Sequence, residues 1–249
     1  CQKTPQQLWE TSGHADTTAE AFRHWDGEDP AEVPISCARC HSTQGFQDFV
    51  GADGTAAGSV ENPVPAADVQ GITCDACHSD QAQALTSVKF PSGETITGLG
   101  KEAICSQCHQ GRESGNSVTA AVTGIDADNA TSRLAFKNIH YYAAAATLFG
   151  TEAKGGYEYP GTTYPGQNSH SLNTCIECHN QHSLEVDIAK CSTCHTTVQS
   201  TDDLKNIRMS STDYDGDGDT AEGIYYELAG QRDNLLSAIQ TYAKAFCGK

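Results

Sequence analysis

The chain has 249 residues and a formal net charge of −17, and Leu, Ile, Val and Phe together make up only about 16 per cent of it. A composition this acidic and this poor in core-forming residues ordinarily predicts disorder. The acidity argues against binding to nucleic acid or to anionic membrane surfaces, and it favours cationic partners or mineral surfaces. No run of about eighteen apolar residues is present, so the sequence predicts no transmembrane segment.

Two short helices are predicted near the N-terminus. Thr4 and Thr17 are each followed three residues later by Gln or Glu, which is the spacing of a capping box at a helix start. The first of these helices also has a proline at its first position. The two helices are expected to carry His14 and His24.

Two further helices, separated by loops, are predicted along the rest of the chain. The stretches 42–71 and 111–129 are rich in Gly, Ala, Asp or Pro and are predicted to be loops. Residues 133–149 predict a central helix that presents His140. The last 25 residues have apolar side chains near helical spacing and predict one amphipathic helix that closes the fold, with Gly230 as a place where it could break.

A repeated cysteine motif is the strongest signal in the sequence. Cys-x-x-Cys followed at once by His occurs five times, and no Cys-x-x-Cys lacks this histidine. Zinc ribbons, disulfides and redox dithiols also use paired cysteines, but none of them requires the histidine. Two thiols at this spacing can bond to the two vinyl groups of one porphyrin, and the next histidine then lies under the iron. The motifs predict five covalently attached c-type haems, held through Cys37, Cys40 and His41; Cys74, Cys77 and His78; Cys105, Cys108 and His109; Cys175, Cys178 and His179; and Cys191, Cys194 and His195.

Five haems would also account for the unusual composition. Each porphyrin is a large apolar plate that short loops can wrap in place of an aliphatic core, so we expect a folded holoprotein and a largely unfolded apo chain. The predicted fold consists mostly of irregular loops with short α-helices wrapped around a chain of covalently bound haems, with little β-structure. One domain, 1–249, is expected, with a three-haem part at 1–115, a connector containing a helix at 116–168, a two-haem part at 169–200, and an acidic loop with the closing helix at 201–249.

Five further histidines could complete the coordination of five irons. All of them lie among or just ahead of the motifs, and the last 54 residues contain no histidine. Each is predicted to be a distal axial ligand, with a surface or propionate-binding role as the alternative; they are His14, His24, His140, His170 and His182. His182 follows His179 by three residues, so it should reach a neighbouring iron. Met209, the only methionine, is an alternative axial ligand that would raise the potential of its haem.

An acidic stretch near the C-terminus resembles the first half of an EF-hand loop. Alternate carboxylates and a glycine turn surround a hard cation in that loop, and the matching residues here are Asp213, Asp215, Asp217, Gly218 and Asp219. The twelfth position is Ile224 instead of glutamate, so a bidentate ligand would have to come from Glu222 or elsewhere. The stretch predicts a structural calcium site, with a merely solvated acidic loop as the alternative.

The two cysteines outside the motifs are Cys1 and Cys247. A mature chain that begins with cysteine looks like a lipoprotein whose first residue carries the lipid. An intrachain disulfide between Cys1 and Cys247 would tie the termini together and is compatible with export. Attachment of c-type haem takes place outside the cytoplasm, so we expect an exported protein whose signal sequence has been removed.

The five motifs, together with the element Cys178-His179-Asn180-Gln181-His182, resemble multihaem c-type cytochromes. The chain is similar to the extracellular or surface cytochromes of bacteria and archaea that respire minerals or electrodes, and the resemblance covers residues 14–195. It implies electron transfer along closely packed, mostly bis-histidine haems, with redox proteins, minerals or electrodes as partners. In some members the subunits polymerise, and an N-terminal histidine ligates a haem of the next subunit; only His14 or His24 could match that role.

The competing class is enzymatic. Multihaem reductases keep one iron with an open or weakly held position. The chain has no Cys-x-x-Cys-Lys motif of the kind found in nitrite reductases, and a closed count of histidines leaves no open iron. We therefore expect an electron carrier and not an enzyme.

Overall fold

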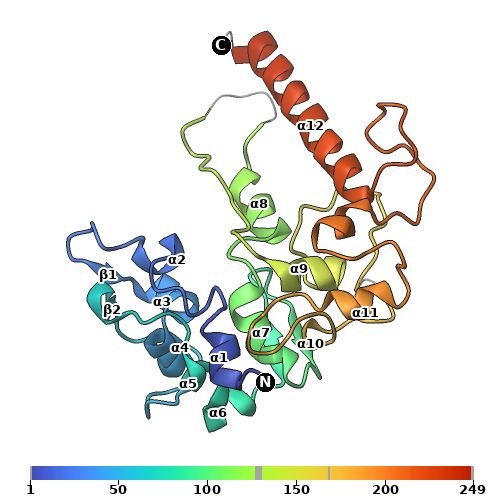
Figure 1. Cartoon of the computed structure of the whole chain (residues 1–249). Helices are drawn as coiled ribbons and strands as arrows, with labels where there is room; N and C mark the ends of the chain where they lie inside the picture. The colour runs from blue at the N-terminus through green and yellow to red at the C-terminus, as the bar shows by residue number, and fades with distance from the viewer. Residues whose placement is uncertain (1, 127–130, 168, 248–249) are drawn as a thin grey trace. The chain divides into compact units, whose positions relative to one another are not determined.

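The computed structural model describes residues 2–126, 131–167 and 169–247 (Figure 1). The chain divides into two compact units: Cys1–Thr123 with Phe136–Glu185, and Gly124–Ala135 with Val186–Lys249. The described part is mostly irregular, with many short helices, little β-structure and one long C-terminal helix, as the sequence predicts.

The first unit contains most of the short elements. Its α-helices are α1 (Pro5–Trp9), α2 (Glu20–Arg23), α3 (Ile35–His41), α4 (Thr43–Val50), α5 (Cys74–His78), α6 (Asp80–Gln83), α7 (Glu102–His109), α8 (Gly115–Val122), α9 (Ala144–Phe149) and α10 (Cys175–Cys178). Its 3₁₀ helices are η1 (Ala66–Asp68) and η2 (Gly150–Glu152). Two small antiparallel pairs complete it: β1 (Glu32–Val33) with β2 (Val64–Pro65), and β3 (Ser87–Lys89) with β4 (Thr95–Thr97).

Four of the five cysteine motifs coincide with short helices. In α3, α5 and α7 the helix ends at the motif histidine, and α10 spans the two cysteines of the fourth motif. Residues three apart lie on the same face of a helix, so each helical turn presents its two sulfurs side by side. The local fold therefore prepares each pair of thiols for one partner.

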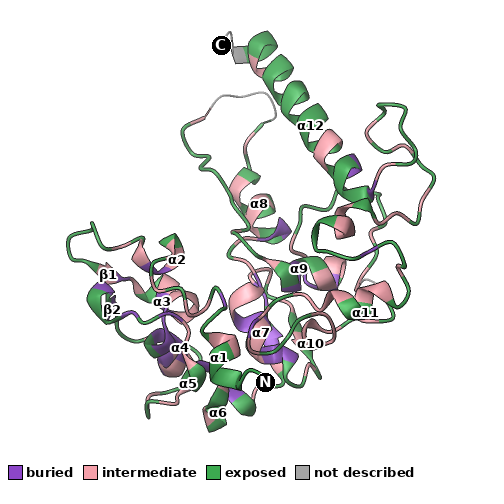
Figure 2. Ribbon diagram, viewed as in Figure 1, coloured by how far each residue is buried: buried purple, intermediate pink, exposed green. Residues whose placement is uncertain are grey.

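Three small apolar clusters stabilise the first unit. One joins β3 to α9 through Val88, Phe90 and Phe149, with the two rings edge-on at 5.9 Å between centroids. A second surrounds Phe22 and Val33, and a third surrounds Phe46 and Val50. Alanines fill many of the other buried positions, and Figure 2 shows the buried residues mainly along α4 and α7. Small side chains bury little apolar area, so these clusters contribute modestly to stability.

Of the two capping boxes predicted near the N-terminus, one is confirmed and the other is wrong. The capping box at Thr4 is confirmed, since its hydroxyl and the Gln7 side chain bond reciprocally to the backbone at the start of α1. The second box is wrong: α2 begins after Ala19, which makes no side-chain cap. His14 lies in a turn after α1 and not on a helix, whereas His24 caps the end of α2.

The predicted helix over 133–149 is largely wrong. Only α9 is helical there, and residues 132–143 form turns and irregular backbone. His140 has a φ of 86° and Tyr142 a φ of 53°, which a right-handed α-helix cannot contain. The end of α9 at Gly150 agrees with the prediction.

The two predicted loops also contain helices. Within 42–71, α4 begins where the Ser42 hydroxyl accepts a hydrogen bond from Gly45 N. Within 111–129, α8 begins with a capping box at Ser114. The prediction of uninterrupted loops from the Gly-rich and Ala-rich composition is therefore wrong at these two helices.

The second unit contains α11 (Ile188–Ser192), the 3₁₀ helix η3 (Asp202–Asn206) and the long helix α12 (Ile224–Cys247). Helix α12 continues through Gly230 without a break, and a glycine is needed there because the Asp215 carboxylate lies where a side chain at position 230 would stand. The apolar residues of this helix are mostly exposed instead of packed against the unit; those more than half exposed are Tyr225, Leu228, Leu235, Leu236, Ile239 and Phe246. No helix among the described residues is long and apolar enough to span a bilayer.

Candidate functional site

Three of the five further histidines each face a motif histidine within the first unit. The ring centroids of His14 and His109 are 6.3 Å apart, with an angle of 20° between the planes. His182 and His78 are also 6.3 Å apart, with an angle of 8°. The pair of His140 and His41 is 5.8 Å apart and nearly perpendicular, at 76°.

These separations match the requirement of one metal ion between two imidazoles. A metal–imidazole bond is about 2.0 Å long, and a ring centre lies roughly 1 Å behind its bonding nitrogen, so two ligands on opposite sides give about 6 Å between centroids. Parallel and perpendicular planes are both compatible, because each ring can rotate about its own metal–nitrogen bond. The residues present therefore fit an iron of a bis-histidine haem at the first three motifs.

Backbone carbonyls orient three of the motif histidines. Nδ1 of His41 lies 2.8 Å from the Ala21 carbonyl, Nδ1 of His109 lies 2.9 Å from the Tyr142 carbonyl, and Nδ1 of His179 lies 2.7 Å from the Leu184 carbonyl. A neutral imidazole that donates from Nδ1 to a carbonyl leaves Nε2 unprotonated. These contacts set the tautomer in which Nε2 can bind a metal.

Strained backbone coincides with the histidine contacts. Among the described residues, the non-glycine positions with positive φ are His140, Tyr142, Lys154 and Leu184. Three of these four contact a motif histidine. The ring of His140 faces a motif histidine, and the carbonyls of Tyr142 and Leu184 each accept a hydrogen bond from one. Left-handed conformations cost free energy in non-glycine residues and concentrate at functional sites. The strained backbone therefore supports a functional role for these histidine contacts.

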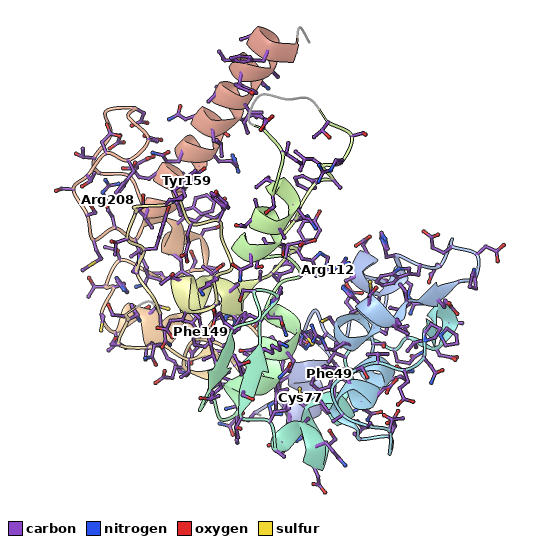
Figure 3. The ribbon with its side chains drawn as sticks, turned by 180° about the vertical axis from the view of Figure 1, so that it is seen from behind. Phe49, Cys77, Arg112, Phe149, Tyr159 and Arg208 are labelled. Carbon is purple, nitrogen blue, oxygen red and sulfur yellow. The ribbon has the colours of Figure 1, made fainter. Side chains whose placement is uncertain are left out.

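Burial favours the neutral form of two of the facing histidines, His14 and His140. Burial first, and the neighbouring His109 second, lower the pKa of His14 to about 4. Burial and then the Arg112 guanidinium, labelled in Figure 3, lower the pKa of His140. A neutral imidazole can bind a metal without first losing a proton, so both rings are ready ligands at neutral pH.

The turn that carries His14 packs tightly on the segment before α5. The Ile72 amide donates to the His14 carbonyl at 2.9 Å. Gly71 has a φ of +75°, and a side chain there would collide with the same carbonyl. The glycine at position 71 is therefore required for the position of His14.

Sulfurs of different motifs lie close together in the first unit. The Cys40 thiol contacts the Cys108 thiol, which lowers the pKa of Cys40 to about 6 and raises that of Cys108. The Cys105 thiol contacts the Cys175 thiol. Burial and then the charge of Cys105 raise the pKa of Cys77, labelled in Figure 3, to about 11. Four of the five motifs therefore converge in one unit.

The other predicted ligands have different surroundings. His24 is exposed, with Nδ1 2.6 Å from a Glu20 carboxylate oxygen and its ring edge-on to Trp25. Nδ1 of His170 lies 3.0 Å from the Leu172 carbonyl. Within the first unit, no described imidazole faces the exposed His179 ring. The fifth motif, Cys191, Cys194 and His195, belongs to the second unit. Met209 is 92 % exposed, which does not favour a place beside an iron.

The acidic loop gathers carboxylates as the EF-hand spacing predicts. Ligand oxygens of Asp215, Asp217 and Glu222 lie within 4.8 Å of one another, and so do those of Asp213, Asp215 and Glu227. One Glu222 carboxylate oxygen is buried without a hydrogen-bond partner among the described atoms. Burial first, and the Asp217 charge second, raise the pKa of Glu222. Asp219 instead accepts hydrogen bonds from the backbone of residues 221 and 222. The donor set fits a hard cation such as calcium.

Glu227 is a residue that the sequence reasoning missed. It is fully buried, and one carboxylate oxygen lies 2.6 Å from Nη1 of Arg208, labelled in Figure 3. Its other oxygen accepts hydrogen bonds from the amides of Tyr214 and Asp215. Burial alone would raise the pKa of Glu227, but the Arg208 and amide hydrogen bonds outweigh it and lower the pKa. Its place in the first turn of an apolar helix was the only signal in the sequence.

Glu102 was also missed, because it stands three residues ahead of the third motif with no pattern of its own. It is 7 % exposed; one oxygen accepts a hydrogen bond from Cys175 N at 2.5 Å, and the other has no partner among the described atoms. Cys1 and the Cys247 side chain lie outside the described residues, so the predicted lipid anchor and disulfide stay predictions.

The chain was compared with models of protein families, with curated proteins and with solved structures. None of the three comparisons found a match.

Proposed function

We propose that the chain is an electron-transfer protein that carries five covalently attached c-type haems. The observation that carries the proposal is the set of three imidazole pairs spaced for one iron each, every pair including the histidine of a Cys-x-x-Cys-His motif. When bound, haem supplies one-electron redox chemistry. The chain's own residues would hold the group: the cysteines would anchor it, and the motif histidine and a second histidine would bind the iron.

Closed coordination favours electron transfer over catalysis at the first three motifs. A substrate needs a vacant or weakly held position on the iron, and His14, His140 and His182, which face motif histidines, would fill that position. The carbonyl contacts to His41 and His109 further restrict ring rotation. Such fixed ligands suit a centre that changes charge without changing its ligands.

The proposal is tested on purified holoprotein by intact mass and by electron paramagnetic resonance of the ferric state. We expect the mass of the chain plus five haems, and low-spin signals from the haems of the first three motifs. Four or fewer haems after complete maturation, or a high-spin signal from most of the irons, would contradict the proposal. Replacing His182 with Ala should convert only the haem of the second motif to high spin.

His179 favours a second candidate function at the fourth motif. Its ring is oriented by Leu184, but no described imidazole of the first unit faces it. One outcome is an open iron and therefore a catalytic haem of the reductase type. The other is that a histidine of a neighbouring copy closes the site in a head-to-tail polymer. The contact of His14 with His109 favours His24 for that second role.

Comparison of dispersed and assembled protein separates these outcomes. A polymer closed by His24 should show one high-spin haem as a monomer, lose that signal in filaments, and regain it in a His24→Ala variant that no longer assembles. Lys3→Ala is the control, because it changes an exposed residue on the same N-terminal segment and should leave assembly intact. Persistent high-spin signal with cyanide binding in every state would favour the enzyme.

We also propose a structural calcium ion at the acidic loop, held by Asp215, Asp217 and Glu222, with Asp213 and Asp219 shaping the turn. Isothermal titration with calcium, and with magnesium for comparison, tests it, and Glu222→Gln should weaken binding. We further propose that the protein works outside the cytoplasm and exchanges electrons with redox proteins, minerals or electrodes; the haem motifs and the net charge of −17 support this.

A further inference from the structure

We propose that the third motif, Cys105, Cys108 and His109 on α7, is the junction of the haem array in the first unit. This inference rests on the proposed function. It concerns the order in which the haems contact one another, which the order of the motifs along the chain does not reveal. Each step depends on a contact between α7 and another motif.

The first contact joins the third motif to the first. Sγ of Cys108 lies 3.6 Å from the Arg39 carbonyl, and Sγ of Cys40 lies 4.0 Å from the Gln107 carbonyl. Each sulfur thus meets the residue that precedes the second cysteine of the other motif. The reciprocal arrangement brings the second cysteines of the two motifs together.

The second contact joins the third motif to the fourth. The buried Glu102 carboxylate at the start of α7 accepts a hydrogen bond of 2.5 Å from Cys175 N, at the start of α10. The first cysteines of the two motifs, Cys105 and Cys175, are also in contact through their thiols. The third motif therefore meets the first motif through one of its sulfurs and the fourth motif through the other.

The third contact joins the third motif to the second. Cys108 and Ile104 pack against the apolar cluster that contains Ala76, which lies between the cysteines of the second motif. His14 makes a second link between the two motifs. Its ring faces His109 of the third motif, and its backbone carbonyl accepts a hydrogen bond from the amide of Ile72, two residues before α5. The third motif thus has close contacts with each of the other three motifs of the unit.

Contacts between sulfurs report contacts between haems, because each thioether sulfur bonds directly to a substituent on the porphyrin edge. A haem at the third motif would have three near neighbours. Charges interact strongly at short range in a partly buried site, so a change in the oxidation state of this haem should shift the potentials of three others. A haem at the second motif would have two near neighbours, the third through the apolar cluster around Ala76 and the fourth through His182, which faces His78 and lies three residues after His179.

Redox titrations of two matched variants, followed by electron paramagnetic resonance, test the junction. His14→Met should raise the potential of the third haem, which then titrates first and loses its positive charge before its neighbours. The midpoints of three other haems should shift to lower potential. In the control, His182→Met should raise the potential of the second haem and lower the midpoints of the third and fourth haems, but not that of the first.

Equal numbers of shifted haems in the two variants, with five haems present by mass, would overturn the junction while leaving the proposed function intact. Too few haems by mass would instead contradict the proposed function. Glu102→Gln gives an independent test without replacing a ligand: it removes a carboxylate shared by the third and fourth motifs. We expect the midpoints of these two haems to rise more than the others, and a uniform shift or none would count against the proposal.

Discussion

The two units of the chain stabilise themselves in different ways. The first contains four of the five motifs, three imidazole pairs and three small apolar clusters that include many alanines. The second contains one motif, a buried ion pair and a cluster of carboxylates, and its long helix leaves most of its apolar residues exposed. We therefore expect the first unit to depend on the haems proposed for its motifs, whereas the second depends on charges around Glu227.

The largest expected effect is loss of the first unit without its central haem. Cys105→Ser with Cys108→Ser removes attachment at α7, which contacts three other motifs. Because the apolar clusters alone bury little area, the four-motif unit should lose protease protection as a whole. The matched control is Cys191→Ser with Cys194→Ser in the second unit, which should leave the first unit protected. Equal protection of the first unit in both double variants would contradict the comparison.

The second effect tests the ion pair in the second unit. Arg208→Ala leaves the Glu227 carboxylate buried without its guanidinium partner, and uncompensated buried charge strongly destabilises a fold. We expect the first turns of α12 and the acidic loop to unfold locally, with faster amide exchange there and unchanged exchange in the first unit. Arg232→Ala is the control, since it removes an exposed pair with Asp233 on the same helix. Similar exchange in both variants would show that the buried pair is dispensable.

The third effect separates a steric contact from backbone strain in the first unit. Gly71→Ala introduces a side chain against the His14 carbonyl, whereas Gly98→Ala has a similar positive φ, 76° against 75°, and no atom within 4 Å of the added carbon. Both substitutions should cost stability, by roughly 1–3 kcal/mol for the strained backbone. Only Gly71→Ala should also displace His14 and produce a high-spin signal at the third haem. High-spin signals in both variants would assign the effect to strain alone.

The sequence predicts the components of the site better than their arrangement. The spacing of Cys105, Cys108 and His109 predicts attachment of one group because the helical turn that aligns them is local. The pairing of His140 with His41 depends on two left-handed residues in a segment whose composition favours a helix, so tertiary contacts override local propensity there. The carbonyls of Ala21, Tyr142 and Leu184 carry no side-chain signal at all. Backbone groups and long-range pairs therefore appear only in the structure.

The smallest expected effect is a dependence of the second unit on calcium and pH. Burial and neighbouring carboxylates raise the pKa of Glu222, so the folded state binds a proton there more tightly than the unfolded chain does. Without calcium, the contribution of Glu222 to the stability of the unit should be fully present below the ordinary pKa of glutamate and should be lost as pH rises through the raised pKa.

Calcium should remove this dependence, because it replaces the proton as the counter-charge. At ten times its dissociation constant it should add about 1.4 kcal/mol to the free energy of unfolding. Thermal unfolding of the holoprotein at pH 4.5 and pH 7, with calcium and with a chelator, measures both effects. In Glu222→Gln the dependence on pH should shrink even with the chelator, since the variant has no carboxyl at this position. The proposal would be contradicted by a pH dependence that is the same in the variant, or by a melting temperature that does not change with calcium at pH 7. The acidic loop would then be only a solvated turn, and the second unit would be stabilised by Arg208 and Glu227 alone.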